Sequence, residues 1–413
     1  MAEALAILVG GGPAPGINGV IASAAMEASK CGLRPIGIYD GYRELAAGRR
    51  PETIELTFDQ VSRIHTSGGS ILRTSRTNPA KDEATLRRCT ESLLALDVRY
   101  LVCIGGDDTT YGAARIAEQT HGRIGIATVP KTIDNDLPLP ENAPTFGFET
   151  ARSVGAGILE SLMEDARTTA RWYVVVCMGR KSGSLSLGMC KAAGSTLAVL
   201  PEEFGKKARL ASVRDTIVGA IVKRRSFGRR HGVVVVAEGI AERVWDDVFA
   251  QADTLSRDSF GNVPLADVPL GIIVRDAVRT RLAEIGVESV VHEKDIGYEL
   301  RCAKPVAFDV DYTRTLGFGA VRYLVGGGSG ALIALEGGNV RPLSLEQLMD
   351  PTTGRIQTRQ VDRTTEAYRV ARDYMVYLEP ADFTDESKLA ALAAQTNLDA
   401  AGFRAQFEAV ALP

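Results

Sequence analysis

The stretch Leu101-Val102-Cys103-Ile104-Gly105-Gly106-Asp107-Asp108-Thr109 decides the fold of this chain. Its first four residues are apolar, its glycines indicate a turn, and residues 111–117 have the composition of a helix. A strand that runs through a glycine turn into a helix presents unpaired backbone N–H groups and the positive end of the helix dipole. Phosphate groups bind well at such a position. The stretch therefore predicts a phosphate site that also carries two neighbouring carboxylates.

The same succession of apolar strand, glycine turn and helix is repeated along the chain. Apolar runs at 7–9, 35–39, 99–104 and 124–129 are separated by segments of helical length, and 17–31 is predicted as the first helix. The pattern starts again after Pro144, with continuous apolar runs at 173–177 and 232–237. Helix-length connections indicate parallel strands, and continuous apolar strands indicate sheets that are covered on both faces. The sequence predicts an α/β fold of two doubly wound, Rossmann-like domains with parallel sheets and an active site in the cleft between them.

The last part of the chain has a different pattern. From about Leu343 onward, glycine-rich strands give way to Ala, Glu and Arg at helical spacing. We expect domain boundaries near residues 140 and 300, a segment at 301–345 that returns to the first domain, and a C-terminal helical extension at 346–413.

The composition excludes several classes of protein. The chain has 413 residues, 45% of them hydrophobic and 24% charged, which is typical of a globular protein with more than one domain. A formal net charge of −3 argues against nucleic acid as a partner, and no apolar run approaches the ~20 residues of a membrane helix. The first apolar run lacks a basic region before it and indicates a strand, so a cytoplasmic location is expected. The six cysteines have no spacing typical of metal ligands or of a disulfide framework.

The acid pair Asp107-Asp108 has a structural and a chemical interpretation. Asp107 alone is explained by capping of the following helix, but it is also a candidate Mg²⁺ ligand, because Mg²⁺ usually binds one or two carboxylates plus substrate phosphates. Asp108 would repel any additional phosphate nearby. Two like charges ~4 Å apart repel by roughly 4 kcal/mol at an effective dielectric of about 20, which is about a thousandfold in binding. Asp108 could therefore exclude a long phosphate donor in favour of a shorter one.

A second motif, Pro130-Lys131-Thr132-Ile133-Asp134-Asn135-Asp136, follows the run at 124–129. Phosphoryl transfer needs a carboxylate that accepts the proton of the attacking hydroxyl and a cation that stabilises the transferred group. Asp134 or Asp136 is the candidate base, and Lys131 is the candidate cation. The alternative is a turn rich in Asp and Asn that has no chemical role.

The glycine-rich segment Gly10-Gly11-Gly12-Pro13-Ala14-Pro15-Gly16 follows the first strand and opens a helix. Its glycines allow the backbone to approach a phosphate closely, and its prolines stiffen the turn. A tight strand–helix turn without a ligand is the alternative, because glycine-rich turns are common.

Together these motifs resemble those of the phosphofructokinase family, and within it the pyrophosphate-dependent branch. The resemblance extends from about Ala4 to Leu335. ATP-using members usually have Asp at the position of Pro13 and Gly at the positions of Asp108 and Lys131. Asp and Lys at the last two positions are the family's markers of the pyrophosphate-dependent branch. The resemblance implies that Asp108 occupies the space of the nucleotide's α-phosphate and that Lys131 neutralises charge on the transferred group.

The resemblance also implies the role of each domain and a set of site residues. Residues 1–140 would bind diphosphate and Mg²⁺, with Asp107 as the metal ligand, and residues 141–300 would bind the sugar phosphate. Asp134 would accept the proton of the 1-hydroxyl of fructose 6-phosphate, assisted by Lys131 and Asp108. The expected diphosphate-binding residues are Gly11, Arg76, Gly106, Asp108 and Lys131. The expected sugar-phosphate-binding residues are Thr132, Ile133, Asp134, Met178, Gly179, Arg180, Glu238, Tyr298, Glu299, Leu300 and Arg301.

Arg171 resembles an arginine that is donated to the neighbouring subunit's sugar site, which implies a homodimer or homotetramer. Some positions depart from the family pattern. His292 stands where many members have a second arginine of this kind, with Lys294 nearby, and Tyr298 replaces a histidine. The sugar specificity could therefore extend to a seven-carbon ketose phosphate.

The resemblance implies reversible, Mg²⁺-dependent phosphoryl transfer from diphosphate to fructose 6-phosphate, giving fructose 1,6-bisphosphate and phosphate in glycolysis and gluconeogenesis. An ATP-dependent kinase is the first alternative, and Asp108 and Lys131 disfavour it. A non-catalytic sugar-phosphate sensor on the same fold is the second, but Asp107 and Asp134, which such a sensor would not need, are both present.

Overall fold

The computed structural model describes residues 2–248, 265 and 268–411, and it divides into two compact units. The first unit contains the residues up to 151 together with 298–359, and the second contains the described residues of 152–297 together with 360–411. Both units are therefore discontinuous in sequence. The boundaries expected near 140, 300 and 345 stay a prediction.

A seven-stranded sheet forms the centre of the first unit, with the strand order β11-β10-β5-β4-β1-β2-β3. Neighbouring strands from β10 to β2 are parallel, whereas β3 pairs with β2 and β11 pairs with β10 in antiparallel fashion. The predicted parallel sheet is thus confirmed for the inner strands and wrong for both edges. The strands are β1 (Ala4–Val9), β2 (Arg34–Ile38), β3 (Thr53–Glu55), β4 (Val98–Gly105), β5 (Gly125–Pro130), β10 (Ala331–Glu336) and β11 (Asn339–Ser344).

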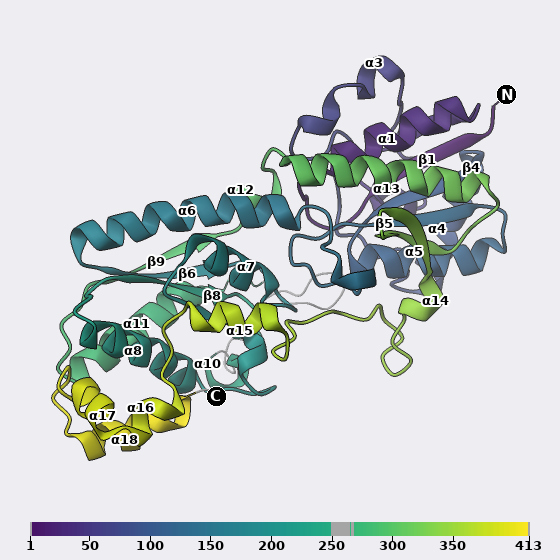
Figure 1. Cartoon of the computed structure of the whole chain (residues 1–413). Helices are drawn as coiled ribbons and strands as arrows, with labels where there is room; N and C mark the ends of the chain where they lie inside the picture. The colour runs from purple at the N-terminus through teal and green to yellow at the C-terminus, as the bar shows by residue number, and fades with distance from the viewer. Residues whose placement is uncertain (1, 249–264, 266–267, 412–413) are drawn as a thin grey trace. The chain divides into compact units, whose positions relative to one another are not determined.

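The inner strands are apolar throughout because they contribute to a core on each face of the sheet. Along β1, Leu5, Ile7 and Val9 belong to one core, and the alternate residues Ala4, Ala6 and Leu8 belong to the other. Helices α1 (Ile17–Lys30) and α13 (Ala307–Val325) pack against each other over the first face (Figure 1). Helices α2 (Arg43–Ala46), α4 (Glu83–Ala95) and α5 (Asp107–Thr120) cover the second. The shorter helices of this unit are α3 (Phe58–Val61), α12 (Tyr298–Arg301) and α14 (Leu345–Leu348).

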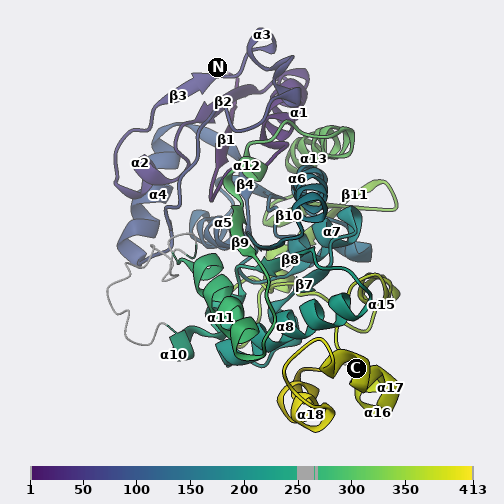
Figure 2. The ribbon, with the colours of Figure 1, turned by 90° about the vertical axis from the view of Figure 1, so that its left-hand side faces the viewer.

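The second unit has a four-stranded, entirely parallel sheet with the order β7-β8-β6-β9. All residues of β8 are buried, as the continuous apolar run predicted. Helices α8 and α11 lie side by side against this sheet (Figure 2). The strands are β6 (Trp172–Cys177), β7 (Leu197–Val199), β8 (Gly232–Ala237) and β9 (Val291–Ile296). The helices are α6 (Phe148–Thr169), which begins in the first unit, α7 (Ser184–Ala193), α8 (Leu210–Ser226), α9 (Ile240–Arg243), α10 (Trp245–Val248) and α11 (Leu270–Glu284).

The predicted C-terminal helices are present and pack on the second unit. They are α15 (Glu366–Asp373), α16 (Pro380–Thr384), α17 (Glu386–Ala393) and α18 (Ala400–Phe407). The buried carboxylate of Glu203 accepts hydrogen bonds from the hydroxyls of Tyr368, at 2.9 Å, and Tyr377, at 3.3 Å. Burial raises the pKa of Glu203. Residues 349–365, between α14 and α15, contain no helix.

The predicted α/β class is confirmed. No helix among the described residues has the length and apolar character required to cross a bilayer.

A buried carboxylate on α13 fixes the start of α6. Asp309 is fully buried and accepts hydrogen bonds from the backbone N–H groups of Gly147 and Thr150, both at 2.8 Å, and from the Thr150 hydroxyl at 2.6 Å. It thereby satisfies N–H groups that a helix start leaves without an intrahelical partner. Burial raises the pKa of Asp309.

We predict that Asp309→Ala lowers the free energy of unfolding by about 2–4 kcal/mol, because it leaves buried donors unpaired. Chemical denaturation followed by circular dichroism measures this change. The matched control is Asp311→Ala on the same helix, where the exposed side chain should cost less than about 0.5 kcal/mol. Equal stability of the two variants would contradict this account of the α6 start.

Candidate functional site

The glycine turn after β1 approaches two other segments of the first unit. The N–H of Gly10 donates to the carbonyl of Ile104 on β4 at 2.9 Å, and the N–H of Gly11 donates to the carbonyl of Ser75 at 2.9 Å. Gly11 has a φ of 81°, a conformation that residues with a side chain rarely adopt. The turn is therefore set by backbone hydrogen bonds to both sides, and approach of its glycines to a phosphate stays a prediction.

The ends of β1 and β4 lie directly against the first turn of α5. A Cβ atom at Gly105 would lie 2.2 Å from the Cβ of Thr109, and one at Gly10 would lie 2.4 Å from the Thr109 hydroxyl oxygen. Only glycine fits at both positions. The N-cap residue of α5 is Gly106, so that Asp107 and Asp108 are the first two residues of the helix. Both carboxylates thus lie at the positive end of the α5 dipole.

Lys131 lies at the end of the neighbouring strand β5 and is 5% exposed. Its N–H donates to the carbonyl of Gly105 at 2.8 Å, and its Nζ donates to the carbonyl oxygen of Gly12. A Cβ at Gly11 would lie 3.1 Å from this Nζ. The backbone of Lys131 is therefore fixed to the end of β4, and its ammonium group lies against the glycine turn that follows β1.

The pKa of Lys131 is lowered to about 8, mainly by burial and also by the positive charges of Arg301 and Arg76, while Asp134 and Asp136 act in the opposite direction. Arg301 comes from α12 and lies beside the same turn, since a Cβ at Gly12 would be 3.4 Å from its guanidinium carbon. Three cationic side chains are thus gathered around one glycine turn, which suits a ligand with several negative charges.

The candidate base lies in the loop after β5. The N–H of Asp134 donates to the hydroxyl oxygen of Thr132 at 3.0 Å, and the hydroxyl of Thr145 donates to the carbonyl of Thr132 at 2.7 Å. The side chain of Ile133 is buried. Hydrogen bonds through Thr132 and Thr145 therefore order this loop, in which Lys131 also contacts the glycine turn, and the role of Asp134 as base stays a prediction.

Two arginines at this site were not predicted. Arg359 donates hydrogen bonds to Asn135 and Ala143, and Arg355 lies 3.8 Å from the Asp108 carboxylate, whose side chain is 32% exposed. Arg359 is 224 residues from Asn135 in sequence, and nothing in its spacing or neighbours distinguishes it from a surface arginine. Only the fold brings it to this loop.

The expected residues of the second unit gather at the carboxyl edge of its sheet. Met178 directly follows β6, Glu238 follows β8, and Gly297 follows β9. The N–H of Glu238 donates to the carbonyl of Cys177 at 2.8 Å, and a Cβ at Gly297 would lie 2.7 Å from the Cε of Met178. Gly179 has a φ of 138°. The ends of β6 and β8 therefore each carry predicted residues, and Gly297 at the end of β9 packs against one of them, Met178.

Arg180 and Arg171 lie at different ends of β6. Arg180 follows its carboxyl end and lies 3.7 Å from the Glu242 carboxylate. Arg171 precedes its amino end and lies 3.9 Å from Asp165. A six-residue strand separates the two arginines by roughly 20 Å, so Arg171 cannot take part in the group at the carboxyl edge.

The α12 residues differ in their exposure. Tyr298 is 66% exposed and Glu299 is also exposed, but the side chain of Leu300 is fully buried and leaves only its backbone available. The guanidinium carbon of Arg301 lies 5.5 Å from the centre of the Tyr298 ring. This turn belongs to the first unit.

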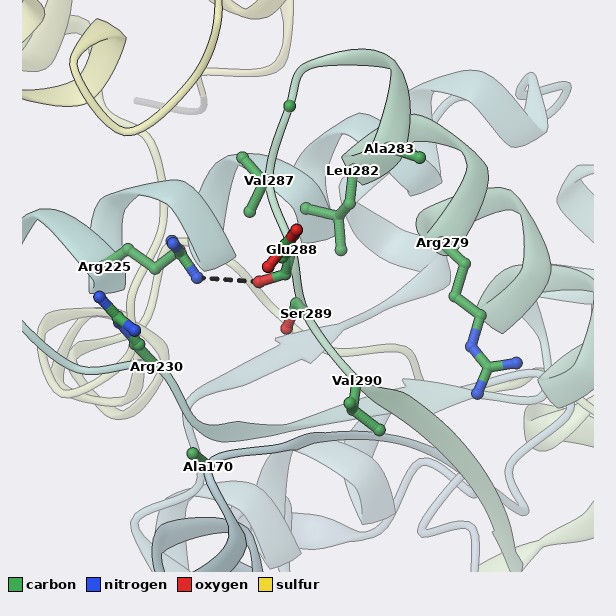
Figure 3. A pocket seen from close by; sticks show the side chains of 11 residues that line it. Ala170, Arg225, Arg230, Arg279, Leu282, Ala283, Val287, Glu288, Ser289 and Val290 are labelled. Atoms are coloured by element: carbon green, nitrogen blue, oxygen red, sulfur yellow. Dashed lines mark hydrogen bonds between the residues drawn. The ribbon is translucent and has the colours of Figure 1, made fainter.

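A basic hollow of about 980 Å³ lies at the amino ends of the strands in the second unit (Figure 3). Figure 3 shows Arg225 and Arg230 next to each other at one end, with Arg279 on the other side of the 287–290 segment. Arg225 donates to the carbonyl of Glu288 at 3.1 Å, and burial together with the charge of Arg230 lowers its pKa. The hollow contains none of the predicted site residues.

Metal ligands are sparse. Within residues 2–248, 265 and 268–411, no group of three or more His, Cys, Asp or Glu side chains is arranged to bind a metal ion. A divalent cation at Asp107 would therefore take most of its ligands from phosphate oxygens and water, as Mg²⁺ commonly does.

Comparison with known proteins identifies the family of this chain. The family model described as phosphofructokinase matches residues 4–324. A pyrophosphate–fructose 6-phosphate 1-phosphotransferase of Thermotoga maritima is 50% identical over 394 residues, which cover 94% of both chains. An enzyme of the same name from Naegleria fowleri is 46% identical over 414 residues, 98% of this chain and 95% of that one.

Among solved structures, a pyrophosphate-dependent phosphofructokinase of Nitrosospira multiformis has the same fold, with a TM-score of 0.68 at 19% identity, over 97% of this chain and 93% of that one. The parallel α/β units, the glycine turns at their strand ends and the family match define one class of protein. This chain belongs to the phosphofructokinase family.

The lowered pKa of Lys131 predicts a pH-dependent affinity for inorganic diphosphate. Since Lys131 loses its proton as the pH rises through about 8, binding should weaken about tenfold between pH 7 and pH 9. Isothermal titration calorimetry measures this change. Lys131→Met should bind more weakly at pH 7 and show less pH dependence, and comparison with it cancels the titration of diphosphate itself. The same pH dependence in both proteins would exclude Lys131 as the titrating group.

Proposed function

We propose that this protein is a pyrophosphate-dependent 6-phosphofructokinase. It transfers a phosphoryl group from diphosphate to the 1-hydroxyl of fructose 6-phosphate and yields fructose 1,6-bisphosphate and phosphate. The observation that carries this proposal is the buried Lys131 ammonium on the carbonyl of Gly12, with the charges of Arg76 and Arg301 close by. The names of relatives that are 46% and 50% identical support it.

The choice of donor follows from the charges at the strand ends. Asp108 lies in the first turn of α5, one position after Asp107. A nucleotide would place an additional phosphate group next to the donor phosphates, and Asp108 would repel it, although Arg355, 3.8 Å from this carboxylate, offsets part of the repulsion. Diphosphate has no such group. Lys131 adds positive charge for the transferred group, so that Asp108 and Lys131 together favour the shorter donor.

The chemical step needs one proton transfer. In this proposal the carboxylate of Asp134 accepts the proton of the 1-hydroxyl as its oxygen attacks the nearer phosphorus. The bond between that phosphorus and the bridging oxygen of diphosphate breaks, and inorganic phosphate leaves with the electron pair. Lys131 stabilises the negative charge on the transferred group, and Arg76 orients the donor. Because the reaction exchanges one phosphate compound for another of comparable transfer potential, it should run in both directions.

Sugar recognition is assigned to residues of both units. Thr132, Ile133, Tyr298, Glu299, Leu300 and Arg301 belong to the first unit, and Met178, Gly179, Arg180 and Glu238 belong to the second. Glu238 is the candidate acceptor for sugar hydroxyls, and Arg301 is the candidate partner of the 6-phosphate. Ile133 and Leu300 have buried side chains, so they would contribute through their backbones. Tyr298 in place of the family's histidine leaves a seven-carbon ketose phosphate as a possible second substrate.

The residues present fit a Mg²⁺ ion, because Asp107 supplies a carboxylate beside the candidate phosphate site, with Gly106 as its neighbour. When bound, Mg²⁺ would offset the charge of the diphosphate oxygens. In this proposal Arg171, which precedes β6 at the end opposite to Arg180, extends to the sugar site of a neighbouring subunit. A homodimer or homotetramer is therefore part of the proposal.

The donor proposal predicts the behaviour of a double variant. The unaltered enzyme should turn over fructose 6-phosphate with diphosphate and Mg²⁺ but not with ATP. Asp108→Gly combined with Lys131→Gly should lose at least about a hundredfold in kcat/KM for diphosphate and gain weak activity with ATP. Steady-state kinetics with each donor alone measures both changes. Glu118→Gln on the exposed part of α5 is the matched control, and ATP activity in the unaltered enzyme would contradict the electrostatic argument.

The base assignment predicts a difference between two carboxylates of one loop. Asp134→Asn should lower kcat by about 10²–10⁴-fold with little change in diphosphate affinity, because it removes proton transfer but no donor contact. Asp136→Asn should lower kcat less, because in this proposal the buried carboxylate of Asp136 does not accept the proton. Comparison of kcat for the two variants is the measurement. A larger loss for Asp136→Asn would transfer the role of base to Asp136.

A further inference from the structure

The segment that follows α14 packs against the 132–145 loop, which contains the candidate base Asp134 and is called the catalytic loop below. Met349 and Ile356 form an antiparallel bridge that closes a turn, in which the N–H of Gln357 donates to the carbonyl of Leu348 at 2.9 Å. Ile356 is 5% exposed and belongs to an apolar cluster that also contains Leu137 and Leu139. This cluster fixes the turn next to the residues that directly follow Asp136.

Arg359 extends from this turn into the loop. Its backbone N–H donates to the carbonyl of Asp136 at 2.7 Å, and its Nε donates to the carbonyl of Asn135 at 3.2 Å. Both terminal nitrogens donate to the carbonyl of Ala143 at 3.1 Å, and Nη2 also donates to the Oδ1 of Asn135. The planar guanidinium thus bridges the two sides of the 132–145 loop, a geometry that a lysine ammonium cannot reproduce.

The residue that Arg359 contacts is conformationally unusual. Asn135 has a φ of 56°, in the left-handed region that few residues with a side chain adopt. Its Oδ1 also accepts a hydrogen bond from the N–H of Thr145 at 3.1 Å. Asn135 is therefore fixed through its side chain, its carbonyl and its backbone conformation. Asp134 directly precedes Asn135, and its own N–H donates to the Thr132 hydroxyl. The orientation of Asp134 therefore depends on both neighbours.

The electrostatics of the loop favour the same arrangement. Burial lowers the pKa of Arg359, and the carboxylate of Asp136 partly reverses this effect, but a guanidinium stays charged at any physiological pH. Hydrogen bonds from a charged donor are stronger than those between neutral groups. Several such bonds from one side chain are enough to select one conformation of a short loop.

We propose that Arg359 is a positioning residue that orients the candidate base Asp134 through Asn135. It lies beyond the residues 4–324 that the family model matches, so the C-terminal part of the chain completes the catalytic loop. The inference rests on the proposed function, because it assumes that Asp134 is the base. Arg359 itself is assigned no contact with either substrate.

Kinetics of Arg359→Met and Arg359→Lys test this proposal. A displacement of about 1 Å at a catalytic group costs up to about a hundredfold, so kcat should fall about 10- to 100-fold in Arg359→Met. The KM for diphosphate should stay within about threefold, because Gly11, Arg76 and Lys131 are not altered. Arg359→Lys should recover part of the loss. Arg341→Met is the matched control, since Arg341 is a half-exposed arginine of β11 that pairs only with Glu336 among the interactions described for it.

A double-mutant cycle tests the route through Asn135. Asn135→Gly keeps the left-handed backbone but removes the Oδ1 acceptor. If Arg359 acts through this contact, the double variant should lose much less than the product of the two single losses. Independent, multiplicative losses would overturn the route, and a kcat of Arg359→Met within twofold of the unaltered enzyme would overturn the proposal.

Hydrogen exchange separates failure of this inference from failure of the proposed function. The amides of residues 132–145 should exchange faster in Arg359→Met than in the unaltered protein, with the rest of the first unit unchanged. Faster exchange in a protein that lacks diphosphate-dependent turnover would keep the loop contact and reject the function. Unchanged exchange would reject the positioning role whatever the enzyme catalyses.

Discussion

The close approach of β1 and β4 to the first turn of α5 is the constraint on which the rest of the first unit depends. Gly10 and Gly105 both lie against Thr109, and neither position has room for a Cβ atom. Because these strand ends can come so near, the backbone N–H groups at the start of α5 and the glycine turn after β1 lie next to each other. Lys131 extends from the adjacent strand β5 and reaches Gly12. This arrangement of the site therefore requires glycine at positions 10 and 105.

Charge distribution gives this geometry its chemical character. The sheet brings a buried ammonium to the glycine turn, and α12 adds Arg301 from a distant part of the chain. Such an accumulation of positive charge is unfavourable without a partner, because burial and like charges both oppose protonation of Lys131. The carboxylates of Asp134 and Asp136 offset part of this cost. A multiply charged anion offsets more of it, so that the site is best satisfied when a ligand is bound.

The sequence indicated the α/β class because that class follows from local patterns. The roles of the site residues, most of which rest on the family resemblance, stay a prediction. Continuous apolar runs predicted β1, β2, β4, β5, β6 and β8, and the glycines that follow several of these runs predicted turns. The inner strand β10 was not predicted. The edge strands were not predicted. β11 has no continuous apolar run, because it is largely polar and exposed. The only local signal for this hairpin is the turn dipeptide Gly337-Gly338 between β10 and β11. Arg359 had no local signal, since its role depends on contacts with residues more than 200 positions away.

The discontinuity of both units has a consequence for synthesis of the chain. β10, which pairs with β5, and α13, which packs on α1, follow more than 150 residues that belong largely to the second unit. The buried Glu203 receives its partners Tyr368 and Tyr377 only near the end of the chain. Neither unit can therefore complete its core while most of the protein is still being translated. During synthesis the edge of β5 stays unpaired until β10 has emerged, and the surface around Glu203 stays uncovered until Tyr377 has emerged. Unpaired strand edges and exposed core surface of this kind favour aggregation and are the features that chaperones protect.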